Sequence, residues 1–285
     1  MAIDTSDFDK IKELRDRTGA GILDCKAALQ ASNGQTESAI DWLRKKGVAQ
    51  AAKRARREAK EGIVAIKLAG SKAALVEVNC ETDFVARTDD FKNLAELTIA
   101  ETLEVGNSAA SSEKLTQKIA ELSGKIGEKI LVRRVQLVET KDGVLFGYTH
   151  FNNKLGVVVE IAAAKPETLK NADFQELGKN LAMQVATSNP LCLARAEVSA
   201  DALEREKAIF NEEVKGKPDN IRDKIVQGKL DKFYQSNCLL EQPFIKEDKQ
   251  SVQQIVAQVS KKIGDTLQVK RFVRYQLGEN IASSA

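Results

Sequence analysis

The sequence predicts an α+β fold with a small helical head, and three observations lead to this prediction. Hydrophobic residues make up 42% of the 285 positions and charged residues 30%, which is an ordinary globular composition. Aromatic residues reach only 5% and there are 4 prolines, so helices are favoured over an all-β barrel. Two long segments repeat one pattern of strands and helices, so we expect a core of two similar α+β subdomains with antiparallel sheets.

Residues 1–47 are predicted to form a three-helix N-terminal domain. Apolar residues recur at helical spacing in three stretches, which are separated by Thr18-Gly-Ala-Gly21 and by Asn33-Gly34. Glycine and asparagine end helices because they adopt left-handed backbone conformations at little cost. A basic linker helix over residues 48–61 is expected next. The basic block that leads into it and continues through it holds Arg44, Lys45, Lys46, Lys53, Arg54, Arg56, Arg57 and Lys60.

The repeated pattern predicts the order of elements in the core. Each copy has two strands of β-branched residues, a helix that begins at Asp-Phe, a further helix and a final strand. The Asp-Phe pairs begin at Asp90 and Asp173, and the Ile-Gly pairs before the last strands begin at Ile126 and Ile263. The second copy is longer, so it must contain an insertion. We expect core subdomain 1 at 62–140, core subdomain 2 at 141–190 and 241–277, the insertion at 191–240 and a C-terminal tail at 278–285.

The insertion is predicted to be a helical hairpin. Two helical patterns flank Gly216-Lys-Pro218, and this turn favours an antiparallel pair of helices. Arms of this length cannot bury their own apolar stripes, so we expect the hairpin to pack on the core or on a partner, including a second copy of the chain.

Residue counts and spacing disfavour several classes of site. Cys25, Cys80, Cys192 and Cys238 form no Cys-x-x-Cys pair, and a single histidine, His150, excludes any site that needs two imidazoles. The glycines near residue 20 lack the Lys-Ser/Thr of a phosphate-binding loop. These observations disfavour most classes of catalytic site, and we expect no metal, no cofactor and no direct nucleotide binding. The apolar runs are too short for a membrane span, and the acidic start is unlike a signal peptide, so a cytoplasmic protein is expected.

The most informative loop covers residues 79–88, between a buried strand and a helix. Its polar residues, among them Thr82 and Asp83, surround Phe84-Val85. Composition favours a buried role for the apolar pair, and a role as an anchor presented to a protein partner stays open. Neither role needs covalent chemistry.

Two other functions stay open on the residues alone. The basic block at 44–60 could bind RNA, although a net charge of only +3 and the lack of interleaved aromatic residues favour a solvated linker. A thiol enzyme could use Cys80 or Cys25 if a basic neighbour lowered the pKa of the thiol. His150 is expected at a strand hairpin as a solvated or contact-forming residue.

Three stretches resemble the bacterial elongation factor Ts family. They are residues 13–29 (ELRDRTGAGILDCKAAL), residues 77–87 (EVNCETDFVAR), and residues 228–233 (GKLDKF) with 242–244 (QPF). The resemblance covers essentially the whole chain in order and spacing. It implies that the head is similar to a ubiquitin-associated domain. It also implies guanine-nucleotide exchange on the GTPase elongation factor Tu during translation elongation, without covalent chemistry.

The resemblance also implies which residues bind the GTPase. Asp83 and Phe84 match a pair that enters between helices of the GTPase near its magnesium and phosphate sites, with Phe84 as the wedge. A homodimer or a complex of two copies with two GTPases is left open, and nucleic acid is not expected as a partner. The implied partner-binding residues are Thr82, Asp83, Phe84 and Val85 in the loop, Arg15, Gly21, Ile22 and Leu23 in the head, Ile126 and Gly127 near the wedge, and His150 in the second subdomain.

Overall fold

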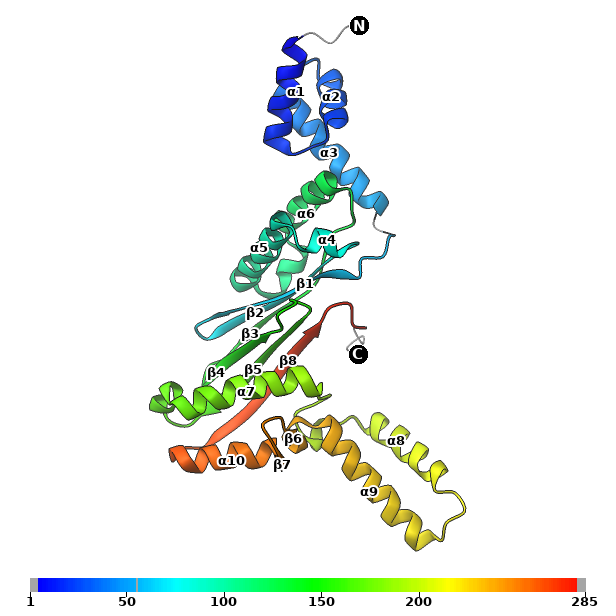
Figure 1. The fold of residues 1–285 in the computed structure, drawn as a ribbon, viewed down its shortest axis with the longest axis vertical. Coiled ribbons are helices and arrows are strands. Elements are labelled where there is room, and N and C mark those ends of the chain that lie inside the picture. Colours follow the sequence, from blue (N-terminus) through cyan, green and yellow to red (C-terminus); the bar gives the residue numbers. More distant parts are fainter. Residues whose placement is uncertain (1–4, 55, 281–285) are drawn as a thin grey trace. The chain divides into compact units, whose positions relative to one another are not determined.

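The computed structural model describes residues 5–54 and 56–280, and Figure 1 shows their fold. These residues pack as two compact units. Unit 1 contains the residues up to 65, residues 74–137 and those from 276 on, and unit 2 contains residues 66–73 and 138–275. Helices combine with small sheets in the described chain, and β4 and β5 pair antiparallel, so the predicted α+β class is confirmed.

Three helices form the head, as the sequence predicts. They are α1 (Thr5–Thr18), α2 (Ile22–Ala31) and α3 (Thr36–Arg54). Asn33 and Gly34 adopt positive φ angles of 51° and 76° in the turn after α2. Helix α3 runs without interruption past residue 47 to Arg54, so the expected linker helix is the continuation of α3 and not a separate element.

The first copy of the repeat consists of a sheet covered by two longer helices. Strands β1 (Glu61–Ala69), β2 (Lys72–Cys80) and β3 (Leu131–Glu139) follow the order β1-β2-β3. The helical elements are α4 (Asp83–Ala86), α5 (Asp89–Val105), η1 (Gly106–Ser111) and α6 (Glu113–Ile126). Val76 of β2, Phe91 of α5 and Leu115 of α6 are buried in one apolar cluster.

The second copy repeats this order, which confirms the internal similarity. Strands β4 (Gly143–Thr149), β5 (Leu155–Ala163) and β8 (Leu267–Gln276) follow the order β4-β5-β8. The helical elements are η2 (Pro166–Lys170), α7 (Ala172–Ser188) and α10 (Val252–Ile263). Phe146 of β4 meets Phe174 of α7 edge to face, with ring centroids 5.4 Å apart, and both residues belong to the second apolar cluster.

The expected insertion is a helical hairpin within unit 2 (Figure 1). Its elements, with the segment that returns to the core, are η3 (Arg195–Glu197), α8 (Ala200–Glu213), α9 (Asp219–Asn237), η4 (Leu239–Glu241), β6 (Pro243–Phe244) and β7 (Glu247–Ser251). A buried glutamine pair secures the returning segment to α7. The Nε2 group of Gln184 donates to Gln242 Oε1 at 3.2 Å, and Gln184 Oε1 accepts from the Ile245 N–H at 2.8 Å.

Candidate protein-binding site

The loop after β2 contains the four-residue helix α4, which separates two neighbouring apolar side chains. Thr82 caps α4, because its Oγ1 accepts from the Val85 N–H at 3.4 Å. Val85 is 8% exposed and packs into the core, whereas Phe84 is 79% exposed. The expectation of a buried role is therefore confirmed for Val85 and wrong for Phe84. The aromatic ring of Phe84 is therefore exposed to solvent, while the next residue, Val85, anchors the loop in the core.

Glu128 fixes this loop through three hydrogen bonds. Its Oε2 accepts from the backbone N–H groups of Glu81 and Thr82 at 3.1 and 3.0 Å, and its Oε1 accepts from Thr82 Oγ1 at 2.7 Å. Hydrogen bonds to a charged acceptor are stronger than neutral ones. We call this arrangement the Glu128 staple. It holds the start of α4, from which Phe84 projects.

The end of α6 places Glu128 beneath the loop. Gly127 ends α6 with a positive φ of 86°, a left-handed conformation that glycine adopts at little cost. The Ser123 hydroxyl then donates to the Glu128 carbonyl at 2.6 Å. The structure thus brings residues 82–85 together with Ile126 and Gly127, which the sequence linked only through the family resemblance.

Glu81 joins the same loop to two further segments. Its Oε1 accepts from the Lys129 N–H at 2.6 Å and from the Arg57 guanidinium at 3.2 Å. The hydrogen bond from Lys129 is the main reason that the pKa of Glu81 lies below its usual value. The carboxylate therefore stays charged near neutral pH and adds a second tie between the loop and the start of β3.

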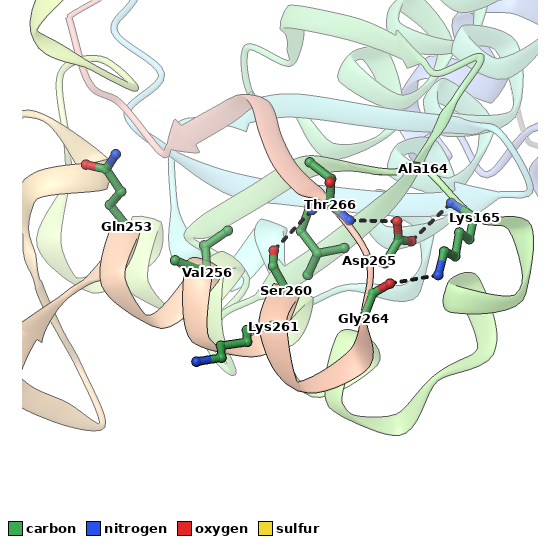
Figure 2. A pocket seen from close by; sticks show the side chains of 11 residues that line it. Ala164, Lys165, Gln253, Val256, Ser260, Lys261, Gly264, Asp265 and Thr266 are labelled. Carbon is green, nitrogen blue, oxygen red and sulfur yellow. Dashed lines mark hydrogen bonds between the residues drawn. The ribbon is translucent and has the colours of Figure 1, made fainter.

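Unit 2 contains an equivalent staple, and Figure 2 shows its hydrogen bond between Asp265 and the Lys165 N–H. Gly264, with a φ of 68°, ends α10, and the next residue, Asp265, accepts from the Lys165 N–H at 3.0 Å and from Thr168 Oγ1 at 2.6 Å. The Thr168 bond is the largest cause that lowers the pKa of Asp265. Asp265 borders a shallow hollow of about 740 Å³. Because its oxygens are already hydrogen-bonded, we assign this carboxylate a structural role.

Glu128 was not predicted from the sequence, although the internal repeat of the chain contains a signal for it. The Ile126-Gly-Glu stretch aligns with Ile263-Gly-Asp, and both acids bind the loop between the second strand and the next helix of their own copy. An acidic residue at the same place in both copies indicates that the fold needs a carboxylate there to hold the loop. Only the first copy adds an exposed phenylalanine to its stapled loop.

The head residues form a separate group on the turn between α1 and α2. Arg15 is exposed, and its carbonyl accepts from the Gly19 N–H at 2.7 Å. Gly21 is the N-terminal cap of α2, and the next two side chains, Ile22 and Leu23, are 54% and 81% exposed. Neighbouring exposed apolar side chains at a helix start are typical of a contact surface.

His150 lies in unit 2, in the turn between β4 and β5, as the sequence predicts. Its Nδ1 is 2.9 Å from the Tyr148 hydroxyl, and its ring centroid is 4.4 Å from that of Phe151. Phe151 is 88% exposed and was not singled out from the sequence. The histidine therefore has an aromatic and hydrogen-bonded setting on the surface of unit 2.

Comparisons with known proteins assign the family. A family model described as Elongation factor TS matches residues 81–279. The elongation factor Ts of Prosthecochloris aestuarii is 43% identical over 94% of this chain and 97% of its own length. That of Methylorubrum extorquens (strain PA1) is 43% identical over 95% and 92%, and that of Nitratidesulfovibrio vulgaris (strain DP4) is 41% identical over 99% and 98%. The chain belongs to the elongation factor Ts family. Its membership shows a role in translation elongation.

The two cysteines considered for a thiol enzyme do not suit nucleophilic catalysis in this elongation factor Ts family member. Cys25 and Cys80 are fully buried, and burial raises the pKa of both thiols, that of Cys80 to about 12. A reactive cysteine needs access and a lowered pKa, so the thiol-enzyme alternative is not supported. Across residues 5–54 and 56–280, no cluster of His, Cys, Asp or Glu side chains is arranged to hold a metal ion.

Several cations of the basic block contact the protein itself. Lys46 forms an ion pair with Asp24 at 2.7 Å, and Arg57 reaches Glu81 at 3.2 Å. Arg54 donates to a backbone carbonyl of α6 at 3.1 Å. These contacts favour a structural role for the block within the family's fold. In the part of the chain that the structure describes, none of the helices has the length and apolarity that crossing a membrane requires.

Proposed function

We propose that this chain is a guanine-nucleotide exchange factor that binds elongation factor Tu and promotes the release of GDP. The observation that carries the proposal is the 79% exposure of Phe84 on a loop fixed by the Glu128 staple. An exposed aromatic ring on a rigid loop is an anchor that loses little conformational entropy when it binds a partner.

In this proposal Phe84 enters between helices of the GTPase, close to the magnesium and phosphate sites of that partner. Mg²⁺ requires nearly ideal octahedral geometry, so a small displacement of the groups around it lowers the affinity for GDP. The coupling is reciprocal, because GDP must weaken binding of this chain by the same factor. The proposed mechanism works by binding alone and breaks no covalent bond.

Asp83 is the second proposed contact of the loop. It forms an ion pair with Arg87 four residues later, at 2.7 Å, and both side chains are well exposed to solvent. Exposed ion pairs contribute little to stability, about 0–1 kcal/mol. Asp83 can therefore exchange Arg87 for a donor on the GTPase, or compete with a ligand of the partner's magnesium, at little cost.

The remaining predicted residues extend the proposed interface. The head would contact the nucleotide-binding domain of the GTPase, and the turn of unit 2 would contact another domain of the same partner. A homodimer, or a complex of two copies with two GTPases, and a site of action in the cytoplasm are part of this proposal. The contacting residues would be Arg15, Gly21, Ile22 and Leu23 in the head, Ile126 and Gly127 beside the loop, and His150 in unit 2.

The test is stopped-flow release of fluorescent GDP from elongation factor Tu, with the chain at micromolar concentration. The wild-type chain is expected to accelerate release in a concentration-dependent way. The Phe84→Ala variant is expected to be at least roughly tenfold slower, because an aromatic anchor can contribute about 2 kcal/mol or more. Phe8→Ala, at another exposed phenylalanine, is the matched control and should keep the wild-type rate.

Two results would count against the proposal. No acceleration by the folded wild-type chain would show that the activity or the partner is wrong, and RNA binding would then be tested by a salt titration, since such binding weakens steeply as salt rises. Full activity of Phe84→Ala would be consistent with the exchange function but would refute the proposed role of Phe84 as the wedge.

A further inference from the structure

Two cysteines meet where the helical hairpin joins the core. Cys192 precedes α8 and Cys238 follows α9, 46 positions later, yet their Sγ atoms are 3.6 Å apart. The two residues form an isolated β-bridge, and the Leu239 N–H donates to the Cys192 carbonyl at 2.9 Å. Both thiols are free in this structure. The backbone of the hairpin base, not chance contact of mobile side chains, holds the two sulfur atoms together.

The geometry of this base suits a disulfide. Paired strands lie about 4.8 Å apart, and a disulfide joins Cα atoms that are about 4.4–6.8 Å apart. The sulfur atoms need to approach from 3.6 Å to roughly 2 Å, which side-chain rotation can supply without moving the backbone far. We propose that Cys192 and Cys238 are a site of reversible disulfide formation, and that its substrates are low-molecular-weight disulfides such as oxidised glutathione.

The exposure of the two thiols sets the order of the chemistry. Cys192 is partly exposed and Cys238 is fully buried. The Cys192 thiolate attacks one sulfur of oxidised glutathione, forms a mixed disulfide and releases one glutathione thiolate, which takes up a proton. The Cys238 thiolate then attacks the Cys192 sulfur and releases the second glutathione. Two protein thiols are oxidised, and one glutathione disulfide is reduced to two thiols.

The surroundings of the pair make this reaction slow at neutral pH. Burial raises the pKa of both thiols, that of Cys238 to about 12. The carboxylates of Glu197 and Glu241 also raise the pKa of Cys192. At Cys238, Cys192 and Glu241 raise the pKa and Arg195 lowers it. Since the thiolate is the attacking species, the exchange is expected to accelerate as the pH is raised toward 9.

The oxidised site would close a loop that contains the whole helical hairpin. The two chain segments at its base would then stay joined even when α8 and α9 move or separate. The base would no longer depend only on the β-bridge and on the hydrogen bonds around it. In the oxidised state, a covalent bond would therefore fix the base of the hairpin on unit 2.

The experiment treats the full chain, first reduced and freed of reductant, with oxidised glutathione at pH 8 under native conditions. Remaining thiols are then blocked, and the chain is digested with trypsin. The expected product links the tryptic peptides 180–195 and 233–246, with the loss of two hydrogen atoms. Free thiols counted after denaturation should fall from the 4 cysteines of the sequence to two.

Variants separate the two steps. Cys192→Ser should abolish the linked peptide, and Cys238→Ser should accumulate glutathione on Cys192, because the second thiol is missing. Cys25→Ser, at a buried thiol of the head, is the matched control and should give the linked peptide in full yield. Titration with mixtures of reduced and oxidised glutathione then gives the reduction potential of the Cys192–Cys238 pair.

Three outcomes would overturn the proposal. They are glutathione adducts without the linked peptide in the wild-type chain, a link that involves Cys25 or Cys80, and a link that forms only in urea. The last result would mean that native packing keeps the two sulfur atoms apart and that unfolding creates the disulfide. Each outcome is independent of whether the chain exchanges nucleotide.

Discussion

Removing the Glu128 carboxylate tests whether a fixed loop is what makes Phe84 effective. In Glu128→Ala, two backbone N–H groups and the Thr82 hydroxyl lose their acceptor. A hydrogen bond to a charged group contributes about 1.5–3 kcal/mol. Because the three donors share one carboxylate and water reaches part of the site, we expect the free energy of unfolding to fall by about 3 kcal/mol in total.

The loop should lose order before the rest of the chain does. Without the staple, Phe84 samples several orientations, and part of the binding energy is spent on ordering the loop. A deficit of about 1.4–2.8 kcal/mol corresponds to a tenfold to hundredfold slower exchange. Glu128→Gln keeps one oxygen acceptor, so we expect a smaller loss in both stability and exchange.

Unit 2 supplies the matched control. Asp265→Ala removes the equivalent carboxylate from the stapled loop of the second copy, which displays no phenylalanine. We expect a comparable loss of stability and an unchanged rate of stimulated GDP release.

The assay combines urea unfolding, followed by circular dichroism, with stopped-flow release of fluorescent GDP at a temperature where every variant is folded. If Glu128→Ala loses stability but exchanges at the wild-type rate, Phe84 does not depend on the staple. If Asp265→Ala slows exchange as much as Glu128→Ala does, general destabilisation explains both results. Either outcome refutes the reasoning.

Three further predictions concern stability. Gln184→Ala leaves the buried Gln242 Oε1 without this donor and the Ile245 N–H without its acceptor, and it should lower the free energy of unfolding by about 3 kcal/mol, which an unchanged urea midpoint would contradict. Gly178→Ala places a Cβ 2.4 Å from the Phe146 ring and should cost about 1–3 kcal/mol in thermal melting, whereas Gly228→Ala has open space and should stabilise α9 by about 0.5–1 kcal/mol. Burial raises the pKa of Cys80 from 9.0 to about 12, so the unfolded state loses this proton first and stability should fall between pH 9 and 12. Cys80→Ala should flatten that part of a pH series of unfolding curves.

Local signals predicted most of the fold. The turn at Asn33 and Gly34, the repeated strand and helix order, and the hairpin around Gly216 all follow from periodicity and turn chemistry. The continuation of α3 could not be predicted in this way, because a glycine at position 47 resembles a stop signal. The helix continues because α3 packs against α6 at this point, where a Cβ built on Gly124 would lie 3.5 Å from the Gly47 Cα.

The candidate site was predicted in part. The sequence marked the loop as functional, but composition alone could not decide which of Phe84 and Val85 turns outward. That choice follows from the capping of α4 by Thr82, which depends on Glu128 from a distant segment. Hydrogen bonds between segments about 46 residues apart leave no periodic trace. The position of the acid after the glycine in both repeats was the one available signal.

The meeting of both ends of the helical hairpin at one β-bridge also bears on how such a chain can change over evolution. The insertion leaves unit 2 at Cys192 and returns at Cys238, and these two residues are paired in the β-bridge. Doubling the length of such a loop adds only about 0.6 kcal/mol of closure entropy. Arms of different length, or a foreign domain grafted near Gly216, can therefore be accommodated while the sheet keeps its register.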